Sequence, residues 1–318
     1  MKIKGYLGYM GRYGLIILLL AGIIWLSKNT ASWMPAAPTP FLHRTPISHL
    51  ATPIFLAVTT VPPQISTTDG MKLMYVPAGE FQMGLTSDQY WNAVISAGKH
   101  CTQSDCEKFF LAEKPAHTVY LDAFWIDQTD VTNAMYAKCA DCKPPSSLFS
   151  NTRTNYYENS EYADYPVIYV SWDQADTYCK WAGRRLPTEA QWEKAARGPD
   201  GRTFPWGEGI DASMANYTNN ERDTTRVDSY PRGASPYGAL DMTGNVWQWV
   251  ADWYDSSYYA NSPNKNPTGP VSGKTRVIRG SSYIILDILA ATTVRLPGDN
   301  ESSPLDSIGF RCAMSAAP

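Results

Sequence analysis

The chain has little net charge. Its 27 Lys and Arg residues are set against 30 Asp and Glu residues, and the formal net charge is −3. This composition lacks the basic excess typical of nucleic-acid binding, so we expect no nucleic-acid partner. Hydrophobic residues make up 44% of the 318 residues, which is enough for a globular core.

Motifs for nucleophilic catalysis are also missing. The sequence contains no Gly-x-Ser-x-Gly motif, and we identify no Ser-His-Asp set among its residues. There are only four histidines, and two of them, His43 and His49, lie in a proline-rich stretch. We expect His117 to be a hydrogen-bonded structural histidine.

Long apolar runs are missing except near the N-terminus, where residues 14–26 carry no charge. Lys2, Lys4 and Arg12 precede this run and Lys28 follows it, so the positive-inside rule places residues 1–13 in the cytoplasm. We predict a single transmembrane helix at residues 14–33 in the lipid bilayer and a periplasmic or extracellular remainder. A cleaved signal peptide, with a weak small-x-small site at residues 30–32, is the alternative.

Repeated prolines follow the apolar run and predict an extended linker at residues 34–70, because proline is incompatible with helix interiors. Residues 71–318 are then the folded domain. We find no internal repeat in them.

Six cysteines occur in the part of the chain predicted to be outside the cytoplasm, where an even count favours disulfides. Cys101 and Cys106 are close in sequence, as are Cys139 and Cys142, so these four could form local or crossed pairs. A zinc site from the same four residues, or a redox pair at Cys139 and Cys142, remains open.

Two helices are predicted from their capping residues. One follows Ser171 and ends before Gly183, and the other follows Thr188 and ends at Gly198, where Thr188 forms a capping box with Gln191. A weaker pattern predicts a third helix over residues 132–140. The rest of the domain is expected to form short strands and long ordered loops.

The segment from Tyr165 to Gly198 strongly resembles the signature of formylglycine-generating enzymes and related sulfatase-modifying factors. Other segments match the family in the same order, and together the matches cover about residues 71–315: Val76–Gly84, Pro115–Asp127, Asp130–Asn133, Phe204–Gly207, Ala215–Asn216, Tyr237–Trp249, Arg279–Gly280 and Ile308–Cys312. The resemblance implies an α+β, C-type-lectin-like fold with little regular secondary structure, here behind one transmembrane helix.

The family resemblance also implies a copper site, which this sequence lacks. Formylglycine-generating enzymes hold copper with two cysteine thiolates just after the motif that matches Arg279–Gly280, and they oxidise a substrate cysteine. The matching stretch, residues 279–295, contains no cysteine, and none occurs between Cys179 and Cys312. The His-x3-His-x-Glu motif of an iron-dependent branch is also missing. We therefore expect neither copper nor iron, and we expect Asp287, alone in the apolar stretch, to face solvent.

Two other features are implied by the resemblance. The first is a disulfide between Cys179 and Cys312. The second is calcium binding, although Gln248 stands where the family usually has Glu, a change that should weaken calcium binding. The implied ligands are Asp241, Gly244, Val246 and Gln248 at one site, and less securely Asn216, Tyr217 and Asp223 at another.

These observations predict a non-catalytic, membrane-anchored interaction module that acts as an accessory or assembly subunit of a larger membrane protein complex. Nothing in the sequence identifies that complex, and an electron-transfer complex is a guess. One alternative is an enzyme of the family with altered chemistry. Another is a calcium-dependent, lectin-like module that binds ligands through the aromatic residues Trp247, Trp249, Trp253, Tyr258 and Tyr259.

Overall fold

The computed structural model describes residues 61–98, 100–146, 153, 155–218, 221–285, 289–298 and 306–316. By its contacts the chain divides into two units, one of residues 1–60 with 98–102 and the other of residues 61–97 with 103–318. All the helices and strands below belong to the second unit. The predicted transmembrane segment lies outside the described residues. Within the described ranges, no helix has both the length and the apolar character needed to cross a bilayer.

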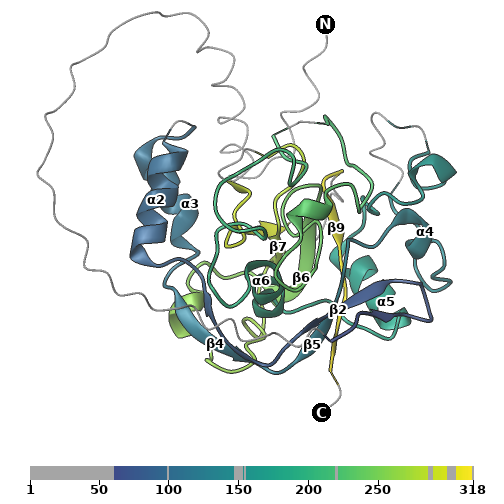
Figure 1. The fold of residues 1–318 in the computed structure, drawn as a ribbon, viewed down its shortest axis with the longest axis horizontal. Helices are drawn as coiled ribbons and strands as arrows, with labels where there is room; N and C mark the ends of the chain where they lie inside the picture. The colour runs from purple at the N-terminus through teal and green to yellow at the C-terminus, as the bar shows by residue number, and fades with distance from the viewer. Residues whose placement is uncertain are drawn as a thin grey trace, which may run out of the picture. The chain divides into compact units, whose positions relative to one another are not determined.

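Ten short strands form three small sheets (Figure 1). An antiparallel sheet has the order β1-β2-β5-β10, a two-stranded sheet pairs β3 with β4, and a mixed sheet has the order β8-β7-β6-β9, in which β6 and β9 are parallel. The strands are β1 (Gln64–Ile65), β2 (Lys72–Val76), β3 (Gly79–Met83), β4 (His117–Leu121), β5 (Phe124–Asp127), β6 (Trp247–Trp253), β7 (Arg276–Arg279), β8 (Arg295–Gly298), β9 (Ile308–Phe310) and β10 (Ala313–Ser315).

The helices are short and separated by long loops. They are α2 (Ser87–Ala97), α3 (Gln103–Leu111), α4 (Asn133–Tyr136), α5 (Trp172–Trp181) and α6 (Glu189–Arg197), with 3-10 turns η2 (Ser160–Tyr162), η3 (Pro231–Gly233) and η4 (Tyr258–Asn261). Helices and strands mix along the chain, as expected for an α+β fold, and most residues are in loops or turns.

The capping residues place two helices where the sequence predicts them. Ser171 and Thr188 each accept a hydrogen bond from the backbone of the residue three positions later, and both form complete capping boxes. Gly198 ends α6 with a φ of 71°, a conformation that favours glycine. The third predicted helix is shorter than expected, because α4 ends at Tyr136.

The sheet begins within the stretch expected to be a linker. Gln64 and Ile65 pair with Leu73 and Lys72, and the carboxylate of Asp69 is buried against the guanidinium of Arg184. Residues 64–70 are therefore part of the folded unit.

Candidate functional site

The stretch that matches the family's copper segment connects two neighbouring strands. It starts from β7 and returns as β8, where Arg279 pairs with Arg295 in the strand register. Its described apolar side chains are mostly buried, including Tyr283, Ile285 and Leu289, whereas Ile284 is exposed. Asp287 lies outside the described residues. Hydrocarbon side chains offer no ligand atom for copper, so this loop has the character of a core segment.

Gly280 allows this loop to pass close to helix α6. Its φ is +93°, and a β-carbon at this position would lie 2.9 Å from the Trp192 ring. Only glycine meets both conditions without strain. The glycine of the matched motif is therefore explained by packing.

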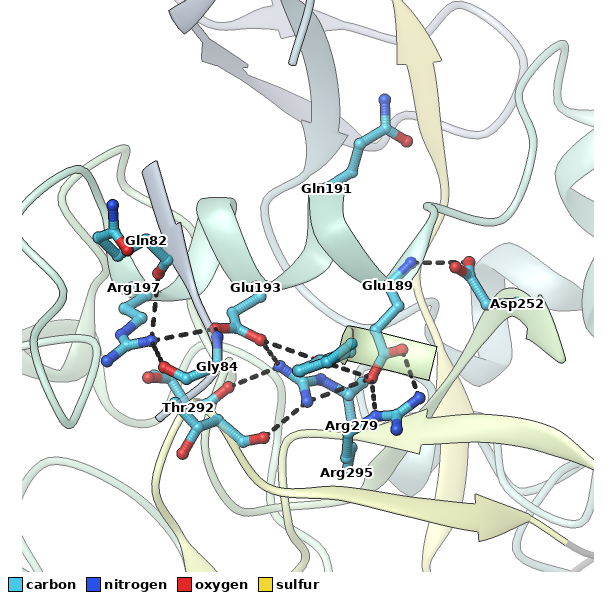
Figure 2. A network of polar contacts seen from close by, with 12 residues as sticks. Gln82, Gly84, Glu189, Gln191, Glu193, Arg197, Asp252, Arg279, Thr292 and Arg295 are labelled. Atoms are coloured by element: carbon cyan, nitrogen blue, oxygen red, sulfur yellow. Dashed lines mark hydrogen bonds and ion pairs between the residues drawn. The ribbon is translucent and has the colours of Figure 1, made fainter. Parts of the chain in front are cut away.

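Helix α6 is buried along its whole length although four of its nine side chains are charged: Glu189, Glu193, Lys194 and Arg197. Glu189 and Glu193 lie four residues apart and so project from the same face. Figure 2 shows both carboxylates pointing toward the arginines of β7 and β8. Arg295 donates two hydrogen bonds to Glu189, at 2.7 and 2.9 Å, and Arg279 donates to Glu193 at 2.6 Å.

Other donors of these arginines contact backbone carbonyls. Arg279 donates to the carbonyl oxygens of Thr292 and Thr293, at 2.9 and 2.8 Å. At the other end of α6, Arg197 donates to Glu193 and to the carbonyl of Gly84, as Figure 2 shows. The network thus fixes the loop 280–294 and strand β3 to one helix, and its charges serve the fold.

Two carboxyl groups beside the network titrate near neutral pH. Burial raises the pKa of Glu113 to about 8, although a contact with Thr293 and the charge of Arg279 act in the opposite direction. Burial, and next the charge of Glu189, raises the pKa of Asp252 to about 7. Asp252 accepts a hydrogen bond from the backbone N–H of Glu189 at 2.8 Å, so it caps the first turn of α6.

A second group of buried carboxylates surrounds Arg184 and Arg311. Burial alone would raise the pKa of Asp69, but hydrogen bonds and the charge of Arg184 lower it to about 2. Burial raises the pKa of Asp127 and of Asp130 to about 7. Arg311 donates to the carbonyls of Asp127, Gln128 and Leu240, and its Nη2 lies 3.7 Å from Oδ1 of Asp130.

The structure brings the first implied calcium set together at the start of β6, but Gln248 is already engaged. Its Oε1 accepts hydrogen bonds from Trp192 and Arg311, and its Nε2 donates to the carbonyl of Asp241. Gly244 has a φ of 79°, in the left-handed region of backbone conformation. Val246, which lies between Gly244 and Gln248 in the sequence, is fully buried. The side-chain oxygen required of Gln248 is therefore directed away from Asp241.

The second implied set is also partly engaged. Asp223 forms an ion pair with Arg153 at 2.8 Å and accepts a hydrogen bond from the backbone of Thr224. Asn216 is buried, and its Oδ1 accepts no hydrogen bond within the described part of the chain. Tyr217 is also buried. Calcium binding at either set therefore stays a prediction, and neither set fits the ion as the side chains stand. Among the described residues, no group of three or more His, Cys, Asp and Glu side chains is arranged to hold a metal.

The disulfides are in place. Cys179 of α5 bonds to Cys312, between β9 and β10, as the resemblance implied. Cys139 bonds to Cys142 in a local loop. Cys101 and Cys106 are also disulfide-bonded, and none of the six cysteines is free to hold a metal.

The aromatic residues considered for ligand binding are mostly in the core. Trp247, Trp249 and Tyr259 are buried, and only Trp253 and Tyr258 are partly exposed. His117 stacks edge-on against Tyr259 and its Nδ1 lies 3.0 Å from the carbonyl of Pro115. This arrangement fits a structural histidine.

An open polar depression lies on strands β3 and β4 instead of beside the copper segment. It is lined by Glu80, Thr118, Tyr120, Asn264 and Lys265. None of these belongs to the loop 280–294. The depression offers hydrogen-bonding groups but no enclosed space for a reaction.

The sequence does not predict that the charged residues of α6 are buried or that they pair with arginines of β7 and β8. The spacing of Ala190, Trp192, Ala195 and Ala196 in the sequence indicates only the apolar face of this helix. The one local signal for the charged network is the spacing of Glu189, Glu193 and Arg197, which places these charged side chains on a second face of the same short helix. A short helix with one apolar face and one charged face, ended by a glycine, is typical of a helix that is buried on all sides.

Comparison with known proteins agrees with the motifs and the fold. A family model described as the sulfatase-modifying factor enzyme 1-like domain matches residues 58–316. The formylglycine-generating enzyme of Streptomyces coelicolor is 33% identical over 298 residues, covering 76% of this chain and 88% of that enzyme. A mouse protein named inactive C-alpha-formylglycine-generating enzyme 2 is 36% identical over 173 residues, covering 49% of this chain and 51% of that protein.

A solved structure shares the fold at low identity. PvdO from Pseudomonas aeruginosa superposes with a TM-score of 0.64 and 23% identity, covering 82% of this chain and 100% of that one. The matched motifs, the fold and the family model all agree over most of the chain. The chain therefore belongs to the family of sulfatase-modifying factor enzyme 1-like domains.

Proposed function

We propose that this chain is a non-catalytic, membrane-anchored member of its family that acts outside the cytoplasm as an accessory or assembly subunit of a membrane protein complex. The observation that carries the proposal is the loop 280–294. It has no cysteine, and Ile285, Leu289 and Ala290 are packed in the interior. A copper oxidase of this family needs two thiolates there.

A relative without the family's activity supports this reading. The mouse protein that is 36% identical over 173 residues carries the word inactive in its name. The family's fold is thus kept in at least one protein described as lacking the reaction. In this chain the disulfide Cys179–Cys312 and the buried network of α6 preserve the same framework.

The anchor is part of the proposal and is supported by the sequence alone. Residues 14–26 are uncharged, and basic residues precede them, which favours a helix with its N-terminus in the cytoplasm. The disulfides suit an oxidising compartment on the other side of the membrane.

The helical hairpin of α2 and α3 is the surface on which we expect the partner to dock. Trp91 and Ile95 lie one turn apart on α2, with exposed fractions of 46% and 72%, and Leu111 at the end of α3 is 58% exposed. The opposite face of α2 is buried through Tyr90, Val94 and Ala97. A helix with apolar side chains on both faces is typical of one that packs on a second protein.

Co-purification tests the proposal. The full chain, tagged at its C-terminus and extracted from native membranes in mild detergent, is expected to co-migrate with one set of partner subunits at fixed stoichiometry. The double variant Trp91→Glu/Ile95→Glu should lose that set. The matched control Ser96→Glu, at an exposed position on another side of the same helix, should keep it. Recovery of the wild-type chain as a lone monomer would contradict the proposal.

A further inference from the structure

The orientation of the buried amide of Gln248 is fixed by its neighbours. Its Oε1 lies 2.7 Å from the indole nitrogen of Trp192 and 2.7 Å from Nε of Arg311. Both neighbours are donors and neither can accept a hydrogen bond. The atom that faces them must therefore be the oxygen, and a flipped amide would place N–H groups against two other N–H groups.

The amide nitrogen consequently faces the implied calcium site. Nε2 donates to the carbonyl of Asp241 at 2.7 Å. Asp241 is buried with a φ of 55°, and its Oδ2 has no hydrogen-bond partner in the described part of the chain. Calcium takes only oxygen ligands, and the hydrogens of an amide NH₂ repel it. The side chain of Gln248, which would have to supply a ligand oxygen to calcium, therefore presents its NH₂ group and keeps the ion out.

Fixed positive charges lie at both implied sites. Arg311 is fully buried beside Gln248 and donates to the carbonyls of Asp127, Gln128 and Leu240. At the other site, Arg153 pairs with Asp223 and lies over the rings of three tyrosines, Tyr156, Tyr162 and Tyr165. A guanidinium keeps its charge at every accessible pH and supplies a cation without a metal.

We propose that the amide of Gln248 closes the site beside Asp241 to calcium and that the single change Gln248→Glu reopens it. A carboxylate has two oxygens. One can accept the hydrogen bonds of Trp192 and Arg311, and the other then replaces the NH₂ group that faces Asp241. Arg311 pairs with only one oxygen of that carboxylate, and the other oxygen then faces the buried carboxyl group of Asp241, where a bound cation stabilises both.

Thermal unfolding of the full chain in detergent tests this proposal. The midpoint of wild-type unfolding should be the same in 5 mM calcium chloride and in EGTA, within about 1 °C, because no ligand bound to the folded state means no shift. The Gln248→Glu variant should unfold several degrees lower than wild type in EGTA and regain most of the loss in calcium. The control Gln82→Glu adds a carboxylate to exposed strand β3 and should show no response.

A second variant keeps the test decisive if Gln248→Glu does not fold. The double change Asp241→Asn/Gln248→Glu exchanges the amide and the carboxylate and keeps the net charge of the site. It should bind one calcium ion per chain by isothermal titration, whereas wild type binds none. Calcium binding by wild type at the Gln248 site, abolished in Asp241→Asn, would overturn the proposal. So would a calcium response that is missing from both the single and the double variant.

Discussion

Buried carboxyl groups determine how the stability of this domain depends on pH. Burial raises the pKa of Glu113 to about 8 and that of Asp127, Asp130 and Asp252 to about 7, all well above their ordinary values. Between the ordinary and the raised pKa, the folded chain holds a proton that the unfolded chain has released. The free energy of unfolding therefore falls as the pH rises from about 5 to about 8.

Replacement of Glu113 by Gln should remove part of this dependence. The variant keeps the shape of the protonated side chain and cannot ionise, so it should be more stable than wild type by about 2–4 kcal/mol at pH 8 and equal to it near pH 5. Urea unfolding at a series of pH values measures the difference. The exposed control Glu158→Gln should follow the wild-type curve. If the Glu113→Gln variant is instead less stable than wild type at pH 8, the ionised carboxylate of Glu113 stabilises the folded chain, which would contradict the prediction.

Arg295 should be one of the most sensitive charged positions. Its guanidinium is fully buried and makes two hydrogen bonds to Glu189, so Arg295→Gln leaves a buried carboxylate without its main partner. We expect a loss of about 3–5 kcal/mol in the free energy of unfolding. Arg202→Gln breaks a partly exposed pair with Asp200 and should cost less than about 1 kcal/mol. Equal losses in the two variants would contradict the structural role of the α6 network.

At this scale the sequence predicts the apolar contacts better than the charged ones. Ala190 and Trp192 stand out by their spacing, and both are buried. The burial of Glu189 and Glu193 depends on arginines about 90 and 106 residues away along the chain, at Arg279 and Arg295. No local sequence pattern predicts that these glutamates pair with these arginines.

At the scale of elements, the two helices with capping boxes could be predicted to within a residue or two. Ser171 and Thr188 satisfy the first backbone N–H groups by local contacts, so the signal is contained in a few residues. The strands are two to seven residues long and pair across the chain, as β2 does with β5 and β5 with β10. Their positions depend on distant partners and could not be read from periodicity.

The disulfide between α5 and the C-terminal strands should contribute more than the local one. Cys179 and Cys312 are separated by 133 positions, whereas Cys139 and Cys142 are separated by three. In the chain-entropy model the long loop contributes about 5 kcal/mol and the short loop about 2 kcal/mol. Removing each pair by substitution with Ser and measuring chemical unfolding should give this order. A larger loss from the Cys139–Cys142 pair would show that the long crosslink does not stabilise the folded state through the unfolded chain.

At the scale of the whole molecule, the family's fold surrounds a segment that contains no cysteine. The framework includes the three sheets, the disulfide of Cys179 and the charged network, and the altered segment is the loop 280–294. Its buried apolar side chains, Ile285, Leu289 and Ala290, pack in the interior of the domain. The exposed apolar side chains of Trp91 and Ile95 on α2 form the surface on which we propose that a partner docks.

The most direct test is to supply the full chain with copper(I) and a cysteine-containing sulfatase peptide, and to measure conversion of the cysteine by mass spectrometry. The Streptomyces coelicolor relative, named as a formylglycine-generating enzyme, is the positive control. Our account predicts no conversion above the rate without protein and no stoichiometric copper on the purified chain. Conversion of the peptide with multiple turnovers would contradict it.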